Sequence, residues 1–148
     1  MKFNKLVPEL TVSDFEKSLK FYATILGFKV EYSRDNPKFA FLSLGGAQIM
    51  IEQKHHATHE WSTAQLEHPF GRGINFQIEV KNLNLPVKKL QKENHPLKMK
   101  PQVNWYKKGT QLLGCKEILV QDPDGYLLRF SQNAGTKKAP LAKQKSNL

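Results

Sequence analysis

The chain of 148 residues lacks several features that would place it in a class at once. Its one cysteine, Cys115, cannot form an internal disulfide, which is typical of a reducing compartment. No apolar run approaches the ~20 residues of a membrane span. The first ten residues, MKFNKLVPEL, lack the apolar segment of a secretory signal. We therefore expect a cytoplasmic protein that does not enter the membrane.

Acidic side chains are also scarce. The sequence has 23 Lys and Arg against 13 Asp and Glu, a formal net charge of +10. Residues 134–148 carry four lysines and no acid among small and polar residues, and this composition predicts a basic disordered tail. The other lysines are spread through residues 1–133 without an RNA-binding or helix-turn-helix signature, so nucleic acid is the least favoured partner.

The first half of the chain has the periodicity of one helix followed by three strands. Residues 12–27 read as a helix that Ser13 or Asp14 caps, that places Phe15, Leu19 and Tyr22 on one face, and that ends at Gly27. Strands are expected at FKVEYS, FAFLSL and AQIMIEQ, and the Gly45-Gly46 pair between the last two predicts a hairpin.

The second half repeats this order, with Val80 aligned to Val12. An apolar strand, INFQIEV, again precedes a helix, in which Leu83, Val87 and Leu90 share a face. The sequence thus predicts an α+β fold of two tandem βαβββ modules, at about 4–53 and 73–133, that form a curled mixed sheet with a concave cleft. Residues 1–133 would be a single domain, with residues 54–72 as a linker or lid.

Alternation along the strands predicts two faces. The apolar set should pack under the helices: Leu10, Leu42, Leu44, Ile49, Ile51, Phe76, Ile78, Val80, Leu128 and Phe130. The opposite set is polar and aromatic, which suits a ligand cleft: Val7, Glu9, Phe39, Phe41, Met50, Glu52, Asn75, Gln77, Arg129 and Ser131. A solvated sheet face is the alternative. The arginine is unexpected in the stretch QDPDGYLLRFSQ, where a turn enters a strand.

Four motifs carry a resemblance to a known family: LTVSDFEKSLKFYATILGFKVEY, AQIMIEQ, GRGINFQIEV and DPDGYLLRF. In this order and spacing the chain resembles the glyoxalase, bleomycin-resistance and extradiol-dioxygenase superfamily, also called the vicinal oxygen chelate fold. Metal-dependent members place His, Gln or Glu at four positions. On this sequence these positions are Val7, Met50, Asn75 and Arg129, and none is a usual metal ligand. The resemblance therefore implies no metal, no cofactor and no catalytic residue in this cleft.

The chain is most similar to the metal-free bleomycin-resistance proteins. That likeness implies a dimer that exchanges its first strand, with Pro8 as the hinge, and antibiotic resistance by sequestering a drug in clefts between the subunits. The ligand would be a bleomycin-type drug or an unknown metabolite. Aromatic contacts would come from Phe39, Phe41, Trp105 and Tyr106, and Met50, Glu52, Asn75, Gln77 and Arg129 would complete the site. Bleomycins are cationic and the known resistance proteins acidic, so the basic chain leaves the ligand open.

Three alternatives remain. The chain could be a metal-dependent lyase, isomerase or dioxygenase of the superfamily with displaced ligands, for which Glu9 and Glu52 are candidates, although pairing with Arg129 is the simpler role for both. The stretch HHATHE could bind a surface metal through His55 and His59, with Glu60, Glu67 and His68 nearby. A basic nucleic-acid module is the third, and its affinity should fall steeply with salt.

Overall fold

The computed structural model describes residues 1–140, apart from the side chain of His59. The first module comprises β1 (Glu9–Val12), α1 (Phe15–Leu19) with its π-helical continuation η1 (Lys20–Leu26), β2 (Lys29–Asp35), β3 (Lys38–Leu44) and β4 (Ala47–Gln53). A short 3-10 helix, η2 (Thr58–Trp61), lies in the linker. The second module comprises β5 (Asn75–Glu79), α2 (Asn84–Lys92), β6 (Leu97–Lys108), β7 (Gln111–Gln121) and β8 (Leu127–Lys138).

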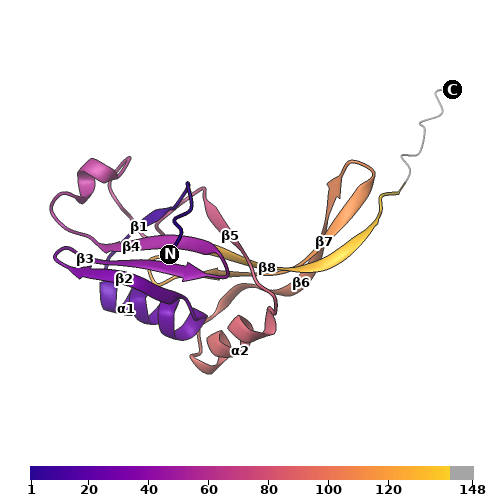
Figure 1. Ribbon diagram of the computed structural model, residues 1–148, viewed down its shortest axis with the longest axis horizontal. Coiled ribbons are helices and arrows are strands. Elements are labelled where there is room, and N and C mark those ends of the chain that lie inside the picture. The colour runs from indigo at the N-terminus through magenta and orange to yellow at the C-terminus, as the bar shows by residue number, and fades with distance from the viewer. Residues whose placement is uncertain (141–148) are drawn as a thin grey trace.

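Each module forms a four-stranded mixed sheet with the same topology. Sheet A has the order β1-β4-β3-β2 and sheet B the order β5-β8-β7-β6. The first and last strands of each module are parallel, and the other pairs are antiparallel. Figure 1 shows α1 and α2 on the same side of the sheets. The prediction of two tandem βαβββ modules is confirmed.

Local sequence signals set the ends of several elements as expected. The Asp14 side chain accepts a hydrogen bond of 3.1 Å from the Lys17 N–H and caps α1. Gly27 adopts a φ of 85° directly after η1, a left-handed conformation that is unfavourable for residues with a side chain. Gly45 and Gly46 have φ values of 58° and 95° between β3 and β4, the geometry of a tight hairpin turn.

One apolar core extends through both modules. All ten side chains predicted to pack under the helices either belong to it or pack against it. Polar contacts also join the modules: the Tyr22 hydroxyl donates to Asp122 Oδ2 at 2.9 Å, the Tyr126 hydroxyl donates to the Thr11 carbonyl at 3.0 Å, and Ser13 donates to Asp124. The two modules therefore share one core and are joined by hydrogen bonds.

The C-terminal half departs from one prediction. β8 continues to Lys138, so residues 134–138 belong to a strand and the predicted tail boundary is too early. The part of the tail at 141–148 lies outside the described residues. Trp105 lies inside β6. Figure 1 shows the outer ends of β6, β7 and β8 projecting from the body as a long curved arm.

Among residues 1–140, no helix is long and apolar enough to cross a membrane. β1 lies beside β4 of its own chain, and the Pro8 carbonyl accepts a hydrogen bond of 2.8 Å from the Met50 N–H at the start of this pairing. Pro8 thus stands at the entry to the first strand, where the resemblance places the hinge.

Candidate functional site

The face of sheet A away from the helices carries two of the four predicted aromatic contacts, Phe39 and Phe41, and other side chains cover both. In the strand register Phe39 is paired with Glu52, and Phe41 with Met50. Both phenylalanines are only 2% exposed. Tyr32 stacks on Phe41 with ring centroids 5.4 Å apart, and Phe3 of the N-terminal segment meets the same ring edge-on at 5.2 Å. A ligand would reach these rings only if their aromatic covers moved.

Glu52 is the polar centre of this face. Its Oε1 lies 2.9 Å from His55 Nε2, and its Oε2 lies 3.5 Å from Arg34 NH2. The Arg34 guanidinium also stands 4.0 Å from the centroid of the Phe39 ring. Burial, with a smaller effect of the Glu52 charge, raises the pKa of the neighbouring Glu9 carboxyl, while Arg34 opposes the rise. This face therefore places the Glu52 carboxylate between Arg34 and His55.

The corresponding face of sheet B is centred on Arg129. Its NH2 donates a hydrogen bond to Gln77 Oε1, and its NH1 lies 3.7 Å from Glu117 Oε1. The predicted pairing of Arg129 with Glu9 or Glu52 is wrong, because Glu117 on the adjacent strand β7 supplies the carboxylate instead. Arg129 keeps 29% of its side chain exposed on the face of sheet B opposite the core.

Glu117 is the residue that the sequence reasoning missed. It is 1% exposed, and its Oε2 accepts hydrogen bonds from Asn104 Nδ2 at 2.8 Å and from the Tyr106 hydroxyl at 2.6 Å. The bond to Glu117 raises the pKa of the Tyr106 hydroxyl. Alternation offered a signal, since Ile118 belongs to the core and its neighbour must face the other way. The pairing itself depends on register across strands, which the sequence does not give.

The two aromatics of β6 are divided between the faces of sheet B. Tyr106 joins the Arg129–Glu117 network. Trp105, the next residue along the strand, points to the opposite face. Its ring lies against Gly114, where a Cβ atom would stand 2.8 Å from Trp105 Cζ3, and Lys137 Nζ lies 3.8 Å from the ring centroid. Trp105 therefore does not share a surface with the other predicted site residues.

The structure gathers the remaining predicted residues into two separate groups. Phe39, Phe41, Met50 and Glu52 lie on sheet A, whereas Gln77, Tyr106 and Arg129 lie on sheet B, with Asn75 exposed on β5. Among the described residues, no hydrogen bond or ion pair joins the two groups. Each group carries its own charges and aromatic surface.

Comparison with known proteins fits this architecture. The family model of the Glyoxalase/Bleomycin resistance protein/Dioxygenase superfamily matches residues 2–130. The chain belongs to this superfamily.

Named relatives of this superfamily chain include enzymes. It is 26% identical over 134 residues to the lactoylglutathione lyase of Haemophilus influenzae, and the alignment covers 86% of this chain and 91% of the relative. It is 28% identical over 134 residues to the probable lactoylglutathione lyase of Synechocystis sp., with 86% and 94% covered. The crystal structure of TioX from Micromonospora sp. ML1 matches with a TM-score of 0.66 at 16% identity, covers 88% of this chain and 98% of TioX, and shows the fold alone.

The residues at the four superfamily ligand positions do not fit a divalent metal. Val7 has no donor atom, Met50 offers a thioether, Asn75 an amide, and Arg129 a permanent positive charge. Arg129 is moreover held by Gln77 and Glu117, so its charge stays at the position of the last ligand. Within the described part of the chain, no three His, Cys, Asp or Glu side chains gather closely enough to hold a metal ion.

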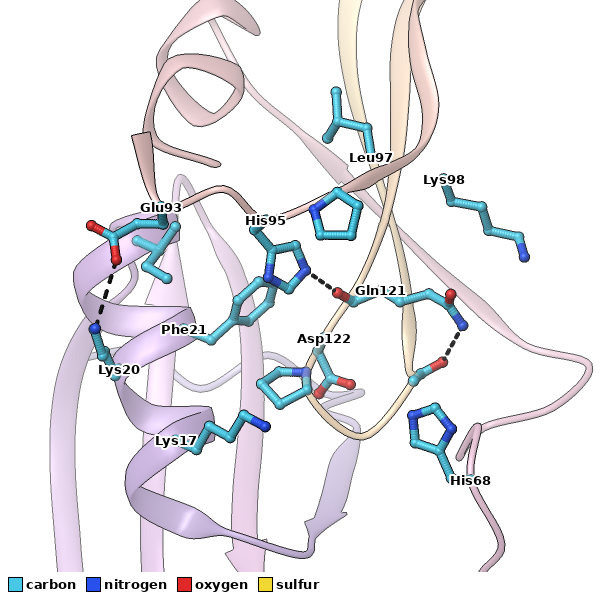
Figure 2. Close-up of a pocket in the computed structure, with 14 residues that line it drawn as sticks. Lys17, Lys20, Phe21, His68, Glu93, His95, Leu97, Lys98, Gln121 and Asp122 are labelled. Carbon is cyan, nitrogen blue, oxygen red and sulfur yellow. Dashed lines mark hydrogen bonds and ion pairs between the residues drawn. The ribbon is translucent and has the colours of Figure 1, made fainter. Parts of the chain in front are cut away.

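Of the two histidines predicted for a surface metal site, the side chain of His59 lies outside the described part of the structure, and His55 is described. His55 turns toward sheet A: Nε2 contacts Glu52, and Nδ1 accepts a hydrogen bond of 3.3 Å from the Ala57 N–H. Both ring nitrogens are thus engaged by the protein. His68 lies apart from it, at the edge of another hollow on the helix side of the molecule (Figure 2).

That hollow has a volume of about 580 Å³ and lies between η1, the end of α2 and the Asp122–Gly125 turn. His95 forms part of its wall, stacks on Phe21 at 4.8 Å and contacts the Gln121 carbonyl at 2.7 Å through Nε2. Lys20 and Glu93 pair at 3.6 Å on its rim (Figure 2). Glu93, His95 and Asp122 contact Lys20, Phe21 and Tyr22 of the first module and so hold the two modules together. The hollow lies away from the predicted cleft.

Proposed function

We propose that the protein binds a small molecule on the cleft face of its sheets without a superfamily metal and without chemical turnover. The observation that carries this proposal is the Arg129 network. A guanidinium fixed by Gln77 and Glu117 offers directional donors to a ligand and repels a metal cation. Tyr106, 42% exposed, adds an aromatic surface beside it.

The ligand class follows from what the two groups of residues offer. Sheet B presents Arg129, Gln77 and Asn75 as hydrogen-bonding groups, and sheet A presents Tyr32 and Arg34 above its covered phenylalanines. A planar ligand with several polar groups matches this mixture. A bleomycin-type drug is one such molecule, and drug resistance would then be the physiological role. An anionic metabolite would meet Arg129 and Arg34 more favourably than a cationic drug.

A homodimer would complete such a site. The two groups of residues belong to different sheets of one chain, and a partner subunit could place its sheet A opposite sheet B. We propose that β1 is exchanged between subunits with Pro8 as the hinge. Its present position beside β4, held from the Pro8 carbonyl onward, is the pairing that a partner's β1 would take over.

The second candidate function is metal-dependent catalysis, and the lactoylglutathione lyase names of the curated relatives favour it. Displaced ligands would have to come from Glu9, Glu52 and His55. Both ring nitrogens of His55 already form hydrogen bonds, with Glu52 and with the Ala57 N–H, and Arg34 lies 3.5 Å from Glu52. This alternative requires those contacts to break before a metal could bind.

Calorimetric titration with metal-free and copper-loaded bleomycin tests the binding proposal. We expect one ligand per subunit with a micromolar or tighter Kd, about 8 kcal/mol. The variant Arg129→Lys keeps a cation beside Glu117 but loses the planar fork, so it should bind about tenfold more weakly. The exposed Lys81→Met substitution serves as the control and should leave the Kd unchanged.

If titration with bleomycin produced no heat of binding, bleomycin would be excluded as the ligand. A panel of aromatic carboxylates then tests the anionic class on the same variants. Equal affinity of wild type and Arg129→Lys for every ligand that binds would contradict the assigned role of Arg129.

A further inference from the structure

The part of sheet B that projects from the body is rich in lysine (Figure 1). Residues 101–116 and 132–140, which we call the basic arm, carry five lysines and no Asp or Glu. The rest of the described chain, residues 1–100 and 117–131, is the body, and it carries sixteen basic and thirteen acidic side chains, so its positive and negative charges nearly balance. The five lysines lie on segments that are far apart in the sequence, and the pairing of β6, β7 and β8 brings these segments together.

Strand register arranges four of the lysines in two rows at the tip of the basic arm. Lys107 and Lys137 flank Leu112 in one row, and Lys108 and Lys138 flank Gln111 in the next. Successive residues of a strand point to opposite faces, so each face of the arm receives one pair. Lys116, opposite Val103 in the register, adds a third cation to the face of Lys107 and Lys137.

The same face presents Trp105 as a flat aromatic surface. Gly114 makes this possible, because any side chain there would collide with the indole ring. The ring remains 39% exposed, and Lys137 Nζ lies over it at 3.8 Å from its centroid, a position that a stacking base would take over. An exposed tryptophan among lysines on a sheet surface is the combination that stacks a nucleobase and neutralises the adjoining phosphates.

We propose that the basic arm binds single-stranded nucleic acid, with Trp105 stacking on a base and Lys107 and Lys137 contacting phosphates. Three strands spaced about 4.8 Å apart, with their side chains, are too wide for the ~12 Å major groove of a duplex. A flat anionic membrane would engage one face of the arm, whereas lysines occupy both.

Fluorescence anisotropy with a labelled oligothymidylate, measured on the full chain between 50 and 200 mM salt, tests the proposal. Each phosphate contact contributes about 0.7 to the slope of log K against log salt. The double variant Lys107→Gln/Lys137→Gln should therefore lower the slope by about 1.4. The matched control, Lys88→Gln/Lys92→Gln on the exposed side of α2, removes equal charge and should leave the slope unchanged.

Trp105 provides a second readout. Trp105→Ala should weaken binding about tenfold or more, the loss expected for one stacked base. In a Trp61→Phe background the oligonucleotide should quench the remaining tryptophan fluorescence. Three results would overturn the proposal: no binding at 50 mM salt, equal loss in both lysine double variants, or unchanged affinity in Trp105→Ala. Preferential binding to phosphatidylserine vesicles over the oligonucleotide would also overturn it, by assigning the arm to a membrane surface.

Discussion

Arg129 and Glu117 show how one ion pair can define a surface at the scale of the residue. Glu117 is fully buried, yet it accepts hydrogen bonds from Asn104 and Tyr106 and forms an ion pair with Arg129. A buried carboxylate without such partners would cost several kcal/mol, so these three partners are what permit its burial. Its Oε1 and the Arg129 Nε nevertheless lack a hydrogen bond in the structure. Arg129 NH1 and Glu117 Oε1 thus lie 3.7 Å apart, and each side chain keeps one polar atom that could form a further hydrogen bond.

Asp122 gives a pH dependence at the same scale. Burial raises the pKa of its carboxyl from 3.8 to about 6, against the lowering effect of hydrogen bonds from Tyr22 and Tyr126. Because the folded pKa lies above the unfolded one, the stabilising contribution is complete below about pH 3.8 and is lost as the pH rises through about 6. The loss amounts to about 3 kcal/mol at most.

We expect Asp122→Asn to flatten the profile of unfolding free energy between pH 4 and 7, because an amide stays neutral and can keep the contacts of Asp122. Urea denaturation at several pH values measures this. Asp35→Asn, at an exposed position on β2, should retain the wild-type slope. An unchanged slope in Asp122→Asn would contradict the assignment.

Sequence reasoning succeeded for residues whose role is local. Asp14 caps α1 and Gly27 ends η1 because the chain within three or four residues decides both. It failed for Glu117, whose burial depends on Asn104, Tyr106 and Arg129 from two neighbouring strands. It also treated Phe39 as a ligand contact, because the covering Tyr32 and Arg34 come from another strand.

At the scale of the element, β8 is longer than its composition indicates. Residues 134–138 have the composition of a tail, but they belong to β8, and residues 136–138 pair with Leu113 to Gln111 of β7. Gly135, with a φ of 89°, lies beside a shift in that register and lets the strand continue. Pairing with a neighbouring strand has outweighed local preference, and the arm results from it.

The turn between β7 and β8 is the element that ties the linker to the modules. Gly125 has a φ of 93°, and a Cβ atom there would lie 2.4 Å from Pro69 Cβ and 2.6 Å from its Cα. Gly73 has a φ of 85° with open space around it. We expect Gly73→Ala to cost about 1 kcal/mol from backbone strain. Gly125→Ala should cost at least ~3 kcal/mol, because the Pro69 backbone must also move.

Chemical denaturation of both glycine variants provides the comparison. A difference between them isolates the contact of the turn with the linker, since the backbone strain is common to both. Equal losses would show that the linker does not rest on this turn.

At the scale of the whole molecule, the internal repeat was visible in the sequence because each module carries its own helix pattern and strand alternation. The two-sheet architecture follows from that repeat. The placement of charge was not visible, because it depends on which strands project from the body. The fold thus separates a nearly neutral body, which carries the candidate cleft, from a basic arm.

Lactoylglutathione lyase turnover tests the central claim most directly, after chelator-treated protein has been reconstituted with Zn²⁺ or Ni²⁺ and its metal content determined. We expect no turnover above the protein-free rate with either metal, because Arg129 holds its positive charge where the last ligand would stand. Turnover that rises with one bound metal per chain would contradict it, and would establish the chain as a metal-dependent enzyme with displaced ligands.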